Sequence, residues 1–356
     1  MIRNLYIQQT GSRTWYVLVG LALLLLAVLL VSLGVGAVPI TGAEALGILW
    51  HQLGGAVEGF NLQQERVLLY IRLPRLVLAM VVGAALGVAG AGLQGLFRNP
   101  LVEPSLIGVS SGAALFAVIA IVFGSALSGF WAVLSGPYLL PVFAFVGGLI
   151  TTLIAYGLGH RGGKIDITVL ILSGIAINAL AGALIGLVIY YADDVALRTF
   201  TFWSMGDLGG ASWENISMAL PMMLLPTLGL TLLGNKLNAL SLGEAEAYHL
   251  GVNVEQVKYS IILLSSMAVG AAVSLTGTIG FIGLVVPHIL RMAFGPDHHV
   301  VLPGSMLAGG IVLLLADLFA RTVAAPSEIP IGIVTALLGA PVFIWLLISA
   351  KKKHII

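Results

Sequence analysis

Ionisable side chains inside apolar segments are the residues of this chain best placed to do chemistry, and Asp317 is the one acid among them. A carboxylate in hydrocarbon is costly, so it predicts either a functional group or a paired one. Arg321 follows four residues later, on the same helical face, and can supply the partner. Both interpretations of Asp317 stay open.

Three arginines stand at the ends of apolar segments. Arg72 and Arg75 lie three residues apart around Pro74, and Arg321 ends a later segment. A guanidinium in such a place can snorkel to lipid headgroups, or it can pair with carboxylates of another protein. Spacing alone leaves both roles possible.

The sequence offers no arrangement for catalysis or nucleotide binding. Its only Gly-Lys pair, Gly163-Lys164, is followed by Ile165 and lacks the upstream glycine of a P-loop. Paired acids, zinc-ligand clusters and Ser/His spacing are also missing from the apolar segments. A lone His288 there is expected to pack or to join a polar network. We expect no catalysis, no ATP binding and no cofactor on this chain.

The elements that must position these residues are apolar. Hydrophobic residues make up 59% of the chain and charged residues 9%, and mean hydropathy is +1.08. With net charge +1 and no basic block, nucleic acid is not an expected partner. Charge-free stretches divided at Gly and Pro predict about ten membrane-spanning helices. They are expected at 15–38, 74–96, 105–123, 139–159, 167–190, 216–234, 259–276, 281–294, 303–320 and 331–349.

The distribution of Lys and Arg predicts the orientation. Placing both termini in the cytoplasm puts most of the cations on the inner side. An internal similarity also suggests an inverted repeat, as many transporters have. It pairs Gly83-Ala84-Ala85, Gly90 and Pro100 with Gly270-Ala271-Ala272, Gly277 and Pro287.

Three ordered blocks of sequence resemble the FecCD-type permeases, the membrane subunits of ABC importers for ferric siderophores, heme and cobalamin. The blocks are RLPRLVLAMVVGAALGVAGAGLQGLFRNPLVEPSLIGVSSGA from residue 72, LSLGEAEAYHLGVNVEQ at 240–256, and ADLFARTVAAPSEIPIGIVTALLGAPVFIWLL at 316–347. The resemblance covers about 60–350. It implies an all-α, type II ABC importer permease fold, with residues 1–356 as a single transmembrane domain.

The resemblance also implies the partners. Two copies of the chain would form the pathway between them in a bacterial inner membrane, on two ATP-binding cassette subunits that bind the ATP. An extracellular or periplasmic binding protein would deliver the cargo, with Arg72, Arg75 and Arg321 matching the family's docking arginines.

The cytoplasmic loop at about 235–258 corresponds in the family to the coupling helix that sits on the ATPase. Its sequence predicts a helix start at 241–244 and a stop at Gly251. A solvated connector is the alternative interpretation. The coupling residues implied are Ser241, Leu242, Gly243, Glu244, Ala247, Leu250 and Gly251. The NPLVEP segment at 99–104 is expected to be a helix hairpin or a gate.

The cargo prediction depends on the 167–190 span and the segment after it, which most resemble the heme-transporting members of the family. In the family this region lines the pathway, and Asn178, Arg198 and Trp203 are the candidate pathway residues. Heme is favoured over ferric siderophore and cobalamin, because Arg198 could attract propionates and the nearby aromatic residues suit a flat apolar face. Axial ligation would need His or Tyr, and none is convincingly placed. An ion-coupled secondary transporter is the rival of a different class, but it would need more intramembrane acids.

Overall fold

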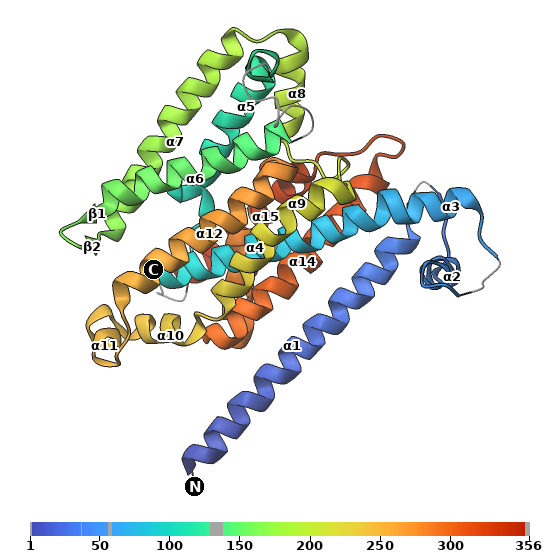
Figure 1. The fold of residues 1–356 in the computed structure, drawn as a ribbon. Helices are drawn as coiled ribbons and strands as arrows, with labels where there is room; N and C mark the ends of the chain where they lie inside the picture. The colour runs from blue at the N-terminus through green and yellow to red at the C-terminus, as the bar shows by residue number, and fades with distance from the viewer. Residues whose placement is uncertain (1, 37, 56–58, 129–137, 353–356) are drawn as a thin grey trace.

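The computed structural model describes residues 2–36, 38–55, 59–128 and 138–352, and they fold as a helical bundle (Figure 1). The long and apolar helices are α1 (Ile2–Gly34), α4 (Leu73–Phe97), α5 (Val109–Ser128), α6 (Leu139–Gly159), α7 (Ile167–Tyr190), α9 (Trp213–Thr231), α12 (Val254–Thr276), α13 (Ile282–Phe294), α14 (His298–Val323) and α15 (Ile331–Lys352). Shorter elements are α2 (Gly42–Gln52), α3 (Leu62–Val67), η1 (Leu68–Arg72), η2 (Pro104–Ile107), β1 (His160–Arg161), β2 (Lys164–Ile165), α8 (Asp194–Ser204), α10 (Gly234–Leu242) and α11 (Glu244–His249).

The ten predicted spans are confirmed as helices of the bundle. Among the described residues, six helices are long and apolar enough to cross a membrane, and α9 with α10 makes a bent seventh. Three shorter apolar helices, within α5, α13 and α15, correspond to the remaining predicted spans. The expected break between the third and fourth spans falls mainly on residues 129–137, which lie outside the described residues.

Several segments outside the predicted spans are also helical. Thr41 with Glu44 forms a capping box at the start of α2, and Asn61 with Gln64 forms another at α3. Each box satisfies backbone N–H groups that a helix start leaves free. Helix α3 then continues through η1 into α4, so residues 62–97 are helical without interruption. Arg72 therefore lies inside a helix and not in a loop.

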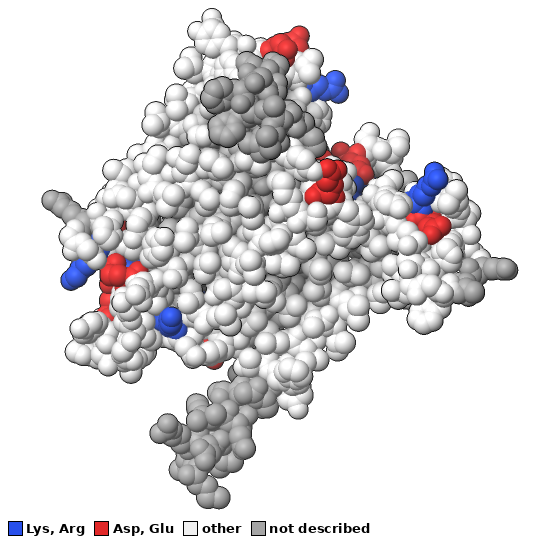
Figure 2. All heavy atoms as spheres, in the orientation of Figure 1, with Lys and Arg blue, Asp and Glu red and all other residues white. Residues whose placement is uncertain are grey.

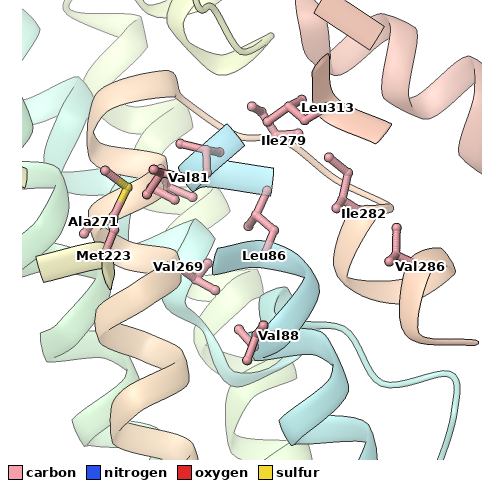
Figure 3. Packing of buried hydrophobic residues seen from close by; sticks show 14 of the residues in the cluster. Val81, Leu86, Val88, Met223, Val269, Ala271, Ile279, Ile282, Val286 and Leu313 are labelled. Atoms are coloured by element: carbon pink, nitrogen blue, oxygen red, sulfur yellow. The ribbon is translucent and has the colours of Figure 1, made fainter. Parts of the chain in front are cut away.

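Helix α4 is the centre of the bundle, with 89% of its apolar window buried. It packs against α9, α12, α13 and α14. A Cβ on Gly83 would come within 2.3 Å of the Gly309 carbonyl oxygen, and one on Gly90 within 1.8 Å of the Gly283 oxygen. Small residues therefore let the backbones approach closely, as expected between helices in lipid. Figure 3 shows Val81 and Leu86 of α4 within the apolar cluster between these helices.

Helix α13 begins halfway along α4. The Gly283 backbone packs on Leu86 and Gly90, near the middle of that helix. The Gln94 side chain, which is 2% exposed, donates to the Gly283, Leu284 and Val102 carbonyls over 3.1, 3.1 and 3.2 Å. The Gly283 carbonyl needs such a partner because Pro287, four residues later in α13, has no N–H to donate to it. Because the same amide also donates to Val102, the NPLVEP segment is a turn packed against the α13 start.

The bundle has two polar ends. One carries α10, α11 and the hairpin of β1 and β2, and we call it the coupling end; the other carries the starts of η1 and α4 and the end of α14, and we call it the arginine end. Figure 2 shows charged side chains toward the ends of the visible face with a white band between them. The hairpin pairs His160 with Ile165 and turns through Gly162 and Gly163, both at positive φ. It is a small addition to the predicted all-α fold.

The possible inverted repeat stays a prediction. Its two Gly-Ala-Ala triplets both lie in the buried middle of helices, α4 and α12. Further along, the segments differ, because Gly90 is inside α4 whereas Gly277 ends α12.

Candidate functional site

An ion-pair cluster holds Arg75 at the arginine end. Arg75 Nε donates to Asp317 Oδ1 over 2.8 Å, and its NH1 donates to Glu328 over 2.7 and 3.0 Å. Asp317 is fully buried on α14, and the Arg75 side chain is 11% exposed. Buried charges need such pairing and hydrogen bonding. The predicted pairing of Asp317 with Arg321 is present as well, at 3.4 Å.

Arg321 and Arg72, also at the arginine end, hold the end of α1. Arg321 donates to the carbonyls of Ser32 and Val35, both over 2.6 Å. Arg72 donates to the Leu33 carbonyl over 2.8 Å and also to Val38. The last carbonyls of a helix lack partners within the helix and carry its negative dipole end, so the two cations satisfy both needs.

The three arginine side chains are used inside this chain, a role that the sequence predicted only for Arg321. Arg72 is 5% exposed, and all three guanidiniums have partners within the chain. The sequence spacing revealed the Asp317 and Arg321 pair, but nothing in it indicated Arg75, which is 242 residues away from Asp317. Docking of a binding protein at these residues stays a prediction.

The coupling segment forms two short helices rather than one. Ser241 and Leu242 end α10, and α11 begins at Glu244 after Gly243, whose φ is +142°. The predicted helix start at 241–244 is confirmed, since α11 begins at Glu244, but Ser241 does not cap it, because its hydroxyl donates to the Asn238 carbonyl. The predicted stop is confirmed: α11 ends at His249, and Gly251 has a positive φ.

Apolar side chains protrude from the coupling end. Leu242, Tyr248 and Leu250 are 67, 72 and 64% exposed, whereas Ala247 is fully buried and seats α11 on the bundle. A groove of about 950 Å³ lies beside them, between α11, the start of α12 and Lys164. Exposed apolar side chains beside a groove are suited to contact with another protein.

A polar contact fixes α10 to the start of α14. Asn238 accepts from the His298 backbone N–H over 2.9 Å and donates to Asp297 over 2.7 Å. Burial alone would raise the pKa of Asp297, but hydrogen bonds from the His299 backbone N–H and from Asn238 outweigh it and hold the pKa below its ordinary value. The ionised carboxylate therefore caps α14.

The three candidate pathway residues do not form one cluster. Asn178 is half-buried and points to the neighbouring elements, donating to the Ser105 carbonyl over 3.1 Å and accepting from the Ser111 hydroxyl. Arg198 and Trp203 lie on α8. Arg198 is exposed, with its guanidinium 5.7 Å from the centre of the Phe202 ring.

Trp203 stacks on Phe200 at 6.2 Å and lines a pocket of about 400 Å³. Asp207 and Glu328 line the same pocket. Among the described residues, no group of three or more His, Asp or Glu could hold a metal ion. His288 is half-buried on α13, and His51 contacts Glu65 at 3.5 Å.

Comparison with known proteins gives the class. The family model of the FecCD transport family matches residues 24–349. The chain therefore belongs to the FecCD transport family.

Similar proteins include permease proteins of two transport systems. The chain is 46% identical to the Hemin transport system permease protein HmuU of Yersinia pestis, over 92% of this chain and 96% of that protein. It is 43% identical to the Vitamin B12 import system permease protein BtuC of Vibrio vulnificus, over 82 and 85% of the two chains. A solved structure described as an inward-facing conformation of a metal-chelate type ABC transporter matches with a TM-score of 0.81 and 35% identity, covering 94% of this chain and 99% of that one.

The protein is thus a multi-pass membrane permease subunit of a bacterial ABC importer. It is a transport component and not a catalyst, and it works with ATPase and binding-protein subunits. Membership of this family removes the ion-coupled secondary transporter as an alternative.

Proposed function

We propose that two copies of this chain form the translocation pathway of a heme importer. The observation that carries the proposal is family membership together with 46% identity to a hemin permease across nearly the whole chain. Helix α8 supports this cargo, because exposed Arg198 could attract propionates and the Phe202 and Trp203 rings could face a flat apolar cargo.

The second copy is proposed to cover α7. Only 22% of the apolar window of this helix is buried, far less than in α4. Gly182 and Gly186 lie one turn apart with nothing within 4 Å of where a Cβ would be. Glycines favour close helix contact in lipid, so this open face suits a packed partner around a pathway.

Each end of the bundle is proposed to bind a different subunit. At the coupling end, Leu242, Tyr248 and Leu250 would contact the ATPase subunit that binds ATP, with both chain termini on this cytoplasmic side. At the arginine end, Arg75 would contact carboxylates of the binding protein. Arg72 and Arg321 would support that surface by holding the end of α1 in place.

Cobalamin is the second candidate cargo, and one feature favours it. The pocket beside Trp203 carries Asp207, whose negative charge opposes heme propionates, whereas the charge of Glu328 in the same pocket is balanced by Arg75. The amide groups of cobalamin would not meet that repulsion. The similar identity to a vitamin B12 permease agrees with this candidate.

A binding experiment separates the two cargoes. The complete complex would be purified with its ATPase and binding protein, and its visible absorption spectrum recorded with heme and then with cobalamin. We expect heme to stay with the complex after gel filtration, with its absorption band shifted from that of free heme. Retention of cobalamin alone would reject heme and leave the importer class intact.

A further inference from the structure

Lys258 is a buried cation at the coupling end, with its side chain 4% exposed. Its ammonium donates to three oxygens: Glu244 Oε2 at 2.9 Å, Glu255 Oε1 at 3.2 Å and the Ile165 carbonyl at 3.2 Å. An ammonium has three donors, so this arrangement uses all of them. We call Lys258 together with Glu244, Glu255 and Ile165 the joint, since every donor of this buried ammonium has an acceptor.

The three acceptors belong to separate parts of the fold. Glu244 is the first residue of α11, Glu255 is in the first turn of α12, and Ile165 ends β2. Glu255 also accepts from the Ile165 backbone N–H over 2.9 Å. Both backbone polar groups of Ile165 are therefore held by the start of α12, and the same lysine holds α11.

Movement of Ile165 would reach α7 directly. The next residue, Asp166, caps α7 by accepting from the Thr168 and Val169 backbone N–H groups over 2.9 and 3.1 Å. Its own N–H donates to the Gly159 carbonyl over 2.9 Å. The start of α7 is thus tied to the hairpin, while most of the helix beyond it is exposed.

The link from Lys258 to α11 is the most accessible part of the joint. The Glu244 side chain is 47% exposed, compared with 32% for Glu255. A subunit that contacts α11 can therefore pull on Glu244 while the contacts of Lys258 to Ile165 and Glu255 remain. A hydrogen bond weakens steeply when its distance or angle changes. Displacing Glu244 is therefore opposed unless Lys258 moves with it.

We propose that Lys258 is the positioning residue through which the coupling helix α11 moves α7, a role that rests on the proposed docking of the ATPase at α11. Lys258 acts through Ile165 and contacts neither cargo nor nucleotide. With Lys258 in place, the start of α7 moves when α11 moves.

The test compares Lys258→Met with Lys236→Met in the complete transporter. Lys236 is exposed on α10 at the same end of the bundle and does not line the groove, so its replacement removes a cation and leaves the joint intact. In proteoliposomes, Lys258→Met should keep its ATPase subunits and hydrolyse ATP, while cargo taken up per ATP falls about tenfold, within the usual range for coupled sites. Hydrogen exchange of the 159–169 peptide should also become faster. Lys236→Met should match the wild type in both measurements.

A second variant keeps the test decisive if Lys258→Met fails to fold. Glu244→Ala changes a half-exposed side chain, cuts the link to α11 and leaves the contacts to Ile165 and Glu255. It should lower uptake per ATP by a similar factor. Wild-type uptake per ATP in a folded Lys258→Met complex, or in Glu244→Ala where Lys258→Met does not fold, would overturn the proposal.

Tyr248→Glu separates this proposal from the docking on which it rests. If the ATPase dissociates from Tyr248→Glu but Lys258→Met couples normally, only the proposed role of Lys258 is rejected. If the ATPase stays bound and coupled in Tyr248→Glu, α11 is not its docking site, and the proposed role of Lys258 is rejected with it.

Discussion

Arg75 on α4 and Asp317 on α14 meet at 2.8 Å although 242 residues separate them. The contact joins the central helix of the bundle to the neighbour with which it packs along its length, at the arginine end. Since Asp317 is fully buried and also contacts Arg321, it is the anion that balances two cations inside the protein. Of the two interpretations of Asp317 that the sequence left open, the structure supports the paired one.

Replacing Asp317 with Ala should destabilise the protein strongly. Removing one partner of a buried pair leaves the other charge uncompensated, which costs about 3 to 5 kcal/mol. Thermal unfolding of the detergent-purified protein measures this effect. Glu328→Gln is the matched control, because Glu328 is 47% exposed and an exposed pair contributes about 0 to 1 kcal/mol. Equal melting temperatures for the two variants would contradict this account.

Glu328→Gln also tests docking at Arg75 without damaging the fold. Glu328 now occupies NH1 of Arg75, where a carboxylate of the binding protein would have to bind. Removing that competing charge should strengthen binding of the binding protein by up to about fivefold, an effect that shrinks with added salt. Affinity can be measured by surface plasmon resonance. Unchanged affinity at every salt concentration would show that Arg75 serves the fold alone.

Two glycine substitutions should have opposite consequences. Gly90→Ala places a Cβ 1.8 Å from the Gly283 carbonyl oxygen, so α4 and α13 must separate and the yield of folded protein should fall. Gly182→Leu meets nothing within the chain, so it should fold normally. Monodispersity on gel filtration after expression under identical conditions compares them. Normal behaviour of Gly90→Ala would contradict the close packing at this contact.

Gly182→Leu should instead weaken association of two copies. If the exposed face of α7 contacts a second copy, a bulky side chain there prevents close approach. Light scattering coupled to gel filtration would give the mass of the complex. A variant complex that still contains two permease chains and transports normally would place the second copy elsewhere.

The coupling end supplies a further prediction. Leu250→Glu puts a charge on a side chain that is 64% exposed, so the fold should survive while ATPase subunits no longer bind. Co-purification of the tagged permease with its ATPase is the measurement. Lys236→Glu, on an exposed position of α10 outside the adjoining groove, is the control for a general charge effect.

The sequence predicted the spans because they are long apolar stretches with at most one charged residue each, a pattern that can be recognised without knowing any tertiary contact. Helix α2 was predictable too, since Thr41 and Glu44 have the spacing of a capping box, but its position in an expected loop concealed it. The end of α11 followed from Gly251 for the same local reason.

The site was less predictable because its contacts are tertiary. Spacing paired Asp317 with Arg321, whereas Arg75 reaches Asp317 only through the packing of α4 on α14. Gln94 gave no sequence signal for the carbonyls of α13 that it binds. The contacts of Asn178 with Ser105 and Ser111 of the adjoining elements had no sequence signal either, and its pathway role stays a prediction.

Uptake by the reconstituted importer tests the central claim most directly. Proteoliposomes would contain the permease with its ATPase, ATP inside and the binding protein outside, and each labelled cargo would be offered in turn. We predict heme accumulation that requires both ATP and the binding protein, with little uptake of cobalamin or a ferric siderophore. Uptake of cobalamin or a ferric siderophore without uptake of heme would contradict the proposed cargo, and heme accumulation without ATP would contradict the proposed mechanism.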